Sequence, residues 1–146
     1  MAQRYQLALF IVTAKGNYLK IVNSTDQSSV QLQGGIGRSF ARMNDGKLLF
    51  VQKSNQNWTL KTLDPVNYAT ETVIETLPLS EDFALLSDGT VLMGSGSRLY
   101  RYKIGDPQKQ WADVADLSKF GIFNIKRLAV SRETDKIAIV NDVYQK

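Results

Sequence analysis

The sequence predicts an all-β fold built from repeated units of four antiparallel strands. Two observations support this prediction. Apolar and polar residues alternate with a period of two in most segments, whereas the 3.6-residue pattern of helices is almost absent. Similar strand–turn–strand segments also begin 43 residues apart, at positions 39 and 82. A repeat of about 40 to 50 residues with four strands is typical of the blades of a β-propeller.

The first element of the repeat is a hairpin of two apolar strands joined by an acidic turn. Gly46 and Gly89 provide the positive φ that a tight turn needs, and Asp45 and Asp88 are interpreted as turn formers. The third hairpin has no glycine at residues 132–135, so we expect a longer turn there. The hairpins are "SFARMNDGKLLFVQ" (39–52), "DFALLSDGTVLMGS" (82–95) and "RLAVSRETDKIAIVN" (127–141).

Third and fourth strands follow each hairpin. The third strands carry a basic residue between apolar ones, with Lys20, Lys61 and Arg101 placed in the same register. The fourth strands are more polar, as outer edge strands need to be if they are not to aggregate. The third strands are "YLKIV" (18–22), "TLKTL" (59–63) and "LYRYK" (99–103). The fourth strands are "SVQLQ" (29–33), "ETVIETL" (71–77) and "QWADVADL" (110–117).

The opening segment "YQLALFIVT" (5–13) corresponds to the second strand of a blade, because Phe10 aligns with Phe50 and Met93. We therefore predict one partial propeller domain over residues 1–146, with about three blades per chain. About three blades do not close a ring of four to eight. Two copies would close a six-bladed ring in trans, as a homodimer, although the strand at 136–141 is surplus to that scheme. Otherwise the remaining blades belong to a longer chain. The blade segments are about 4–33, 38–77, 82–117 and 125–142.

Composition limits the function. The chain has neither cysteine nor histidine, which excludes disulfides, thiolate metal sites and catalysis by Ser-His-Asp or Cys-His groups. This disfavours an enzyme, and we predict no cofactor. The net charge of +4 comes from scattered residues, so we predict no nucleic-acid partner. No apolar run approaches the roughly 18 to 20 residues of a membrane span, and the apolar run near the start is too short for a signal peptide.

Two glycine-rich segments and one acidic cluster invite functional interpretations that fail. "GGIGRS" (34–39) lacks the spacing of a phosphate-binding loop and leads into a strand, and "GSGSR" (94–98) joins two strands. The carboxylates Glu81, Asp82 and Asp88 are too few to hold a calcium ion, which takes six or more ligands from several segments. We therefore predict no catalytic, cofactor-binding or metal-binding residue.

Aromatic residues recur near the third strands, at Tyr18, Trp58, Tyr100 and Tyr102. Packing between neighbouring blades is the expected role of most of them, and a recognition surface is the alternative. The candidate surface for a ligand or partner consists of Trp58, Tyr100, Tyr102 and Arg98.

The segment "IKRLAVSRETDKIAIVND" (125–142) resembles the I-x-x-LAVSPDGKKIAFVS pattern of the TolB-like, WD40-like repeats of six-bladed propellers, and "EDFALLSDGTVLMGSGSRLYRY" (81–102) is similar. The turn proline of the pattern is absent from all three hairpins. The resemblance implies a protein-interaction module or a domain attached to an enzyme, often exported in bacteria. The expected location is periplasmic if the N-terminus is truncated and cytoplasmic otherwise.

Taken with the resemblance, the residues predict a non-catalytic β-propeller module that binds a protein or a small molecule. The alternative is part of a six-bladed hydrolase of lactonase or esterase type, whose site forms only in the complete ring. Two acidic residues facing a channel would favour the hydrolase, whereas apolar, serine and threonine side chains would favour the binding module.

Overall fold

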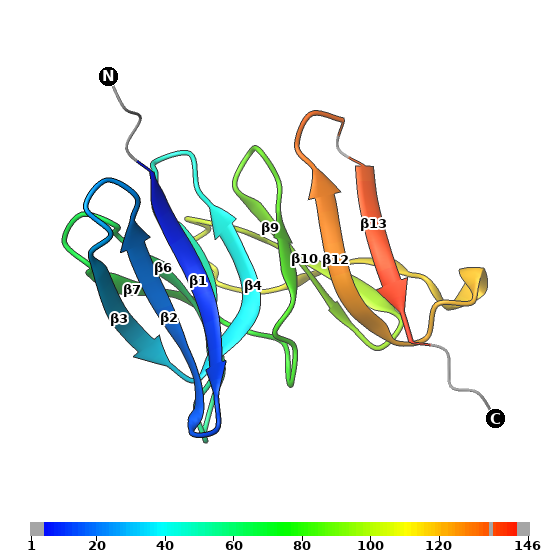
Figure 1. Ribbon diagram of the computed structural model, residues 1–146. Helices are drawn as coiled ribbons and strands as arrows, with labels where there is room; N and C mark the ends of the chain where they lie inside the picture. The colour runs from blue at the N-terminus through cyan, green and yellow to red at the C-terminus, as the bar shows by residue number, and fades with distance from the viewer. Residues whose placement is uncertain (1–4, 135, 143–146) are drawn as a thin grey trace.

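The computed structural model describes residues 5–134 and 136–142. Over these residues the chain forms thirteen strands in four antiparallel sheets, with one short 3-10 turn, η1 (Ser118–Phe120) (Figure 1). The predicted all-β fold class is confirmed. No helix in this described part is both long and apolar enough to cross a membrane.

The sheets follow one another along the chain and contain three, four, four and two strands. The first sheet has the order β1-β2-β3, formed by β1 (Gln6–Thr13), β2 (Gly16–Asn23) and β3 (Ser29–Gly34). The second has the order β4-β5-β6-β7, formed by β4 (Ile36–Arg42), β5 (Leu48–Gln52), β6 (Thr59–Leu63) and β7 (Thr70–Glu75).

The third sheet repeats the arrangement of the second, and the fourth contains only the first hairpin of the repeat. The third sheet is formed by β8 (Phe83–Leu85), β9 (Thr90–Ser95), β10 (Arg98–Lys103) and β11 (Ala112–Asp116). The fourth is formed by β12 (Ile125–Ser131) and β13 (Lys136–Asn141). In a ring closed by two copies, β12 would pair with a strand of the second copy. In the structure, β13 already pairs with β12 along that edge. Ring closure by a second copy stays a prediction.

The glycine turns have the predicted conformation. Gly46 has a φ of 88° and Gly89 a φ of 86°. The Asp45 carboxylate accepts a hydrogen bond from the Lys47 backbone N–H at 3.0 Å, and Asp88 accepts one from Thr90 at 2.9 Å. The Thr90 backbone N–H is the main reason that the pKa of Asp88 lies below its ordinary value. Both aspartates are turn formers, as predicted.

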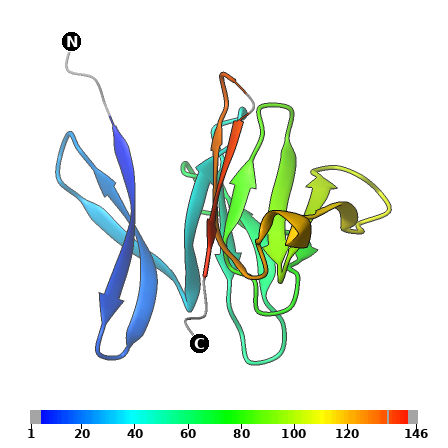
Figure 2. The same ribbon diagram turned by 90° about the vertical axis from the view of Figure 1, so that its right-hand side faces the viewer.

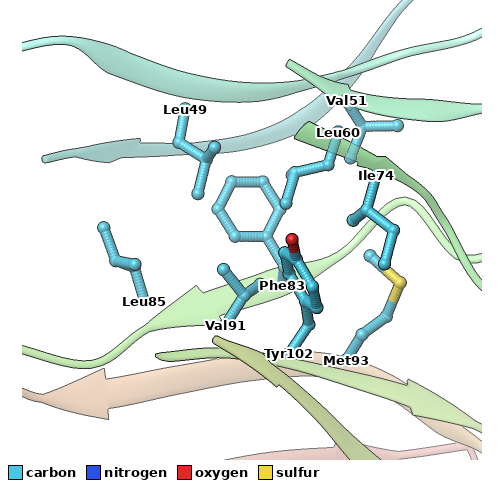
Figure 3. Close-up of a cluster of buried hydrophobic side chains, with 9 residues drawn as sticks. All are labelled: Leu49, Val51, Leu60, Ile74, Phe83, Leu85, Val91, Met93 and Tyr102. Atoms are coloured by element: carbon cyan, nitrogen blue, oxygen red, sulfur yellow. The ribbon is translucent and has the colours of Figure 1, made fainter. Parts of the chain in front are cut away.

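Three apolar clusters join the sheets in sequence, one at each junction between neighbours. In the middle cluster, side chains of the second sheet meet those of the third (Figure 3). The first cluster joins the first and second sheets, and the last joins the third and fourth. The middle cluster contains Leu49, Val51, Leu60, Ile74, Phe83, Leu85, Val91, Met93 and Tyr102. Each of the two middle sheets therefore packs on both of its faces.

The predicted alignment of Phe10 with Phe50 and Met93 is wrong by one residue. Phe50 lies in the cluster that the second sheet shares with the first, and Met93 lies in the cluster that the third shares with the second. Both therefore face the preceding sheet. Phe10 packs in the same cluster as Phe50 but from the first sheet, so it faces the following sheet. Because side chains alternate along a strand, a shift of one residue moves a side chain to the opposite face.

The predicted register of the basic residues needs the same correction. Lys61 pairs with Phe50, and Tyr100 pairs with Met93, which is the equivalent of Phe50. Tyr100 is therefore the equivalent of Lys61, and Arg101 lies one position further along its strand.

Polar side chains also link successive sheets at equivalent positions of the repeat. The Ser39 hydroxyl donates a hydrogen bond to the Asp82 carboxylate, 43 residues further along the chain. The Asn44 side chain donates to the Ser87 carbonyl oxygen at 3.0 Å, again across 43 residues. The second oxygen of Asp82 accepts the Leu128 backbone N–H at 2.5 Å, so this one carboxylate connects the second, third and fourth sheets.

Candidate ligand-binding surface on the inner strands

The first strands of three successive sheets lie side by side and form one continuous surface. These strands are β4, β8 and β12, and each lies at an edge of its own sheet. Figure 1 labels β4, in cyan, and β12, in orange. A hollow of about 430 Å³ is lined by residues from all three strands, and a second of about 310 Å³ adjoins it at Arg38 and Leu128. We call the walls of these two hollows the inner surface.

Positive side chains dominate the inner surface. Arg38, Arg42 and Arg132 line the larger hollow, and Lys126 and Arg127 line the smaller one. All five residues are exposed. Arg38 forms an ion pair with Glu81 at 3.3 Å, whereas no ion pair within the described residues involves any of the other four. Among the described residues, the inner surface therefore holds four cations that no carboxylate contacts directly.

The two carboxylates of the inner surface are already engaged. Glu81 lies between the guanidinium of Arg38 and the ammonium of Lys53. Asp82 accepts hydrogen bonds from Ser39 and from the Leu128 backbone. Both groups hold neighbouring sheets together. In the part of the chain that the structure describes, no group of three or more Asp, Glu, His or Cys residues could hold a metal ion.

Two of the aromatic residues named from the sequence contribute to the core. Tyr102 is 3% exposed, and its ring centroid lies 5.9 Å from that of Trp111. Burial is the main reason that the pKa of Tyr102 is raised, and the charge of Asp106 adds to the effect. Trp58 is half-buried against the same cluster, with the Lys53 ammonium 4.8 Å from its ring centroid. Of the two interpretations of Tyr102, packing between sheets is the one that its burial supports.

Arg98 and Tyr100 lie together on β10, in the third sheet, whereas Trp58 lies just before β6 of the second. Arg98 is paired with Asp113 and, at 3.5 Å, with Asp116. The hydrogen bond and charge of Asp113 raise the pKa of Arg98 above its ordinary value. The structure thus places these residues on two different sheets, and their role in binding stays a prediction.

Sequence reasoning missed the cations of the inner surface. Arg38 and Arg42 stand four residues apart in "IGRSFAR" (36–42), and Lys126, Arg127 and Arg132 flank "LAVS" (128–131). The two groups are almost 90 residues apart in the sequence, so together they do not form a basic run that can be recognised there. These cations can be recognised as one surface only when β4 and β12 are known to be the first strands of sheets that lie on either side of β8.

Comparisons with known proteins support the fold and leave the activity open. No protein-family model matches the sequence, and no curated protein matches it either. Among solved structures, TolB from Acinetobacter baumannii superimposes with a TM-score of 0.68 at 18% identity, covering 94% of this chain and 35% of that one. Puromycin hydrolase has a TM-score of 0.65 at 20% identity, covering 86% of this chain and 22% of that one.

A further structure, a mutant of puromycin hydrolase complexed with PGG, has a TM-score of 0.65 at 16% identity and covers 97% of this chain and 27% of that one. The chain thus spans between about a fifth and a third of the length of these neighbours. At such identities the likeness concerns the fold alone. It confirms the propeller architecture that the repeats predicted.

Proposed function

Because the chain has the fold of part of a TolB-like β-propeller, we propose that it is a non-catalytic binding module whose inner surface holds an acidic peptide segment. The observation that carries this proposal is the group of exposed cations that have no carboxylate partner among residues 5–134 and 136–142, chiefly Arg42, Arg127 and Arg132. Guanidinium groups bind carboxylates through two parallel hydrogen bonds, which adds geometric specificity to the charge attraction.

An extended acidic segment suits the inner surface better than a compact anion does. The cations come from β4, from β12 and from the turn that follows β12, with β8 between the two strands, so they are spread along two adjoining hollows. Charges on an extended chain can follow this distribution, whereas a single carboxylate meets only one or two of them. Because the cations are exposed, the attraction is screened by salt.

The test is the binding of a fluorescent hexaglutamate peptide to the full chain, followed by anisotropy. We expect the double variant R127Q/R132Q to weaken binding about tenfold or more, which corresponds to about 1.4 kcal/mol. The matched control is R101Q/K109Q, which also removes two charges, because both residues are exposed and neither lines the inner surface. Binding should also weaken as salt increases. An equal loss in the control and in the double variant would contradict the proposal, as would equal binding of hexalysine.

The alternative, part of a hydrolase, is favoured by the name of two structural neighbours, puromycin hydrolase. It is tested on the same preparations with chromogenic esters and aminoacyl amides. Turnover that is lost in Glu81→Gln or Asp82→Asn variants that remain folded would favour the hydrolase. Peptide binding without turnover would favour the binding module.

A further inference from the structure

We propose that a groove between the first and second sheets binds an amphipathic carboxylate with an aliphatic tail. This inference goes beyond the proposed function, because the groove lies between two sheets, whereas the inner surface runs along the first strands. The two sites share one residue, Arg42, which lines both. Its volume is about 660 Å³, within the range of small-molecule sites of roughly 300 to 1,000 Å³. Figure 2 shows the first sheet, in blue, standing beside the second.

The floor of the groove is aliphatic and comes from both sheets. Ala8 and Ile21 belong to the first sheet, and Leu48 and Leu63 to the second. Leu63 is completely buried and Ile21 is 6% exposed, whereas Ala8 and Leu48 are half-buried. All four belong to the cluster that joins the two sheets. An alkyl chain in the groove would therefore extend an existing apolar cluster and remove Ala8 and Leu48 from water.

The rim of the groove carries two cations, and both come from the second sheet and its turn. Arg42 ends β4 and is exposed, and Lys47 is half-buried just before β5. No ion pair in the described part of the chain involves either residue. The nearby carboxylate of Asp45 accepts the backbone N–H of Lys47. Two cations that no carboxylate of the described chain contacts attract an anionic ligand, because an opposite charge within about 4 to 6 Å favours the charged form.

The groove is held in shape by a contact across its end. The Gln6 side chain of β1 donates a hydrogen bond to the Pro65 carbonyl oxygen, beyond β6, at 3.3 Å. This contact ties the start of the first sheet to the second. Two hydrogen bonds between Tyr5 and Ser24 fix the same end of β1. The Tyr5 backbone N–H donates to the Ser24 hydroxyl at 2.9 Å, and the Ser24 backbone N–H donates to the Tyr5 carbonyl oxygen at 2.9 Å. A site whose walls are held by such contacts loses little freedom when a ligand enters.

The arrangement specifies the chemistry of the ligand. The floor is aliphatic, so it suits a saturated tail, and the rim is cationic, so it suits a carboxylate head. A cationic amphiphile of the same tail length would bring its charge against Arg42 and Lys47. An uncharged alcohol would leave both cations without a partner.

The test measures the binding of decanoate, below its micelle concentration, to the full chain by isothermal titration calorimetry. We expect Lys47→Gln to weaken decanoate binding at least fivefold. Lys15→Gln removes the same charge at the opposite end of β1, in the turn before β2, and should leave binding unchanged. Decyltrimethylammonium should bind at least tenfold more weakly than decanoate.

A second variant tests the floor. Ala8→Phe places a large side chain in the groove and should abolish decanoate binding, while circular dichroism checks that the sheets remain folded. R127Q/R132Q should bind decanoate normally, which separates this site from the inner surface. The proposal is overturned if wild-type protein does not bind decanoate, if Lys47→Gln binds it unchanged, or if the cationic amphiphile binds equally well.

Discussion

Two strands of similar apolar character, β1 at one end of the molecule and β9 in its middle, differ sharply in burial. Five of the six residues of β9 are buried, whereas none of the eight residues of β1 is. Met93 of β9 packs toward the second sheet and Leu92 toward the fourth, so the strand is covered on both faces. In β1, by contrast, Leu7 is 51% and Val12 69% exposed.

The fourth sheet repeats this contrast within a single hairpin. Ile125 and Leu128 of β12 are buried against the third sheet, whereas Ile137 and Val140 of β13 are 39% and 55% exposed. The comparison teaches that an apolar side chain in this fold is buried where a neighbouring sheet covers the face on which it lies. Composition determines that a strand forms, and the neighbours determine how much that strand stabilises the fold.

The strongest way to test this comparison is to remove the same side chain from both regions. Leu60 of β6 is fully buried in the middle cluster, so Leu60→Ala should cost about 2 to 5 kcal/mol of unfolding free energy. Leu7→Ala, at the exposed face of β1, should cost less than about 1 kcal/mol. Urea denaturation measures both values. Equal costs would mean that something covers the face of the first sheet in solution.

A smaller effect is expected from adding an atom where two sheets meet most closely. A Cβ on Gly94 would lie 2.5 Å from Cγ2 of Ile125, so Gly94→Ala should destabilise the fold by about 1 to 3 kcal/mol. Gly34→Ala, whose Cβ would lie 3.7 Å from its nearest neighbour, is the control for the first sheet. Thermal unfolding measures both. Combining Gly94→Ala with Ile125→Ala should give less than the sum of the two costs, and simple additivity would argue against the clash.

The smallest predicted effect concerns Tyr102 and depends on pH. Its folded-state pKa is raised above 10.0 by burial, so the folded protein holds the phenol proton more tightly than the unfolded chain does. The corresponding stability is complete below pH 10.0 and is lost as pH rises through the folded-state value. Tyr102→Phe should remove this alkaline loss, and at pH 7 it should cost about 1 kcal/mol or less, for the bond to the Asp106 carbonyl oxygen.

Unfolding free energies measured between pH 7 and 11 in both proteins test the expectation. The difference between the two curves is the informative quantity, because the other tyrosines contribute equally to both. A parallel pair of curves would show that the Tyr102 phenol titrates alike in the folded and unfolded chains.

Local signals in the sequence were sufficient for the fold class. Gly46 and Gly89 mark turns because only their positive φ closes a two-strand hairpin tightly, and the spacing of these turns exposes the repeat. The face on which Phe10 lies could not be predicted, since alternation is preserved when a strand is shifted by one residue. Deciding between the two faces requires the neighbouring sheet.

The candidate surfaces were harder to predict, because their residues come from segments far apart in the sequence. Arg42 and Arg132 are unremarkable in the sequence and meet only through the lateral packing of β4, β8 and β12. Glu81 and Asp82 attracted attention as a possible metal site, yet the structure uses them to join sheets. In the sequence, two neighbouring acidic residues look the same whether they bind a metal or join sheets, and only their partners in the structure distinguish the two roles.

The bonds from Ser39 to Asp82 and from Asn44 to Ser87 join equivalent positions of consecutive repeats. The same position of the repeat is therefore a donor in the second sheet and an acceptor in the third, and serine and aspartate divide the two roles. A gene that copied one unit unchanged would set serine against serine or aspartate against aspartate, and the serine–aspartate bond would be lost. The bond from Asn44 would survive such a copy, because its acceptor is a backbone carbonyl oxygen that every residue provides.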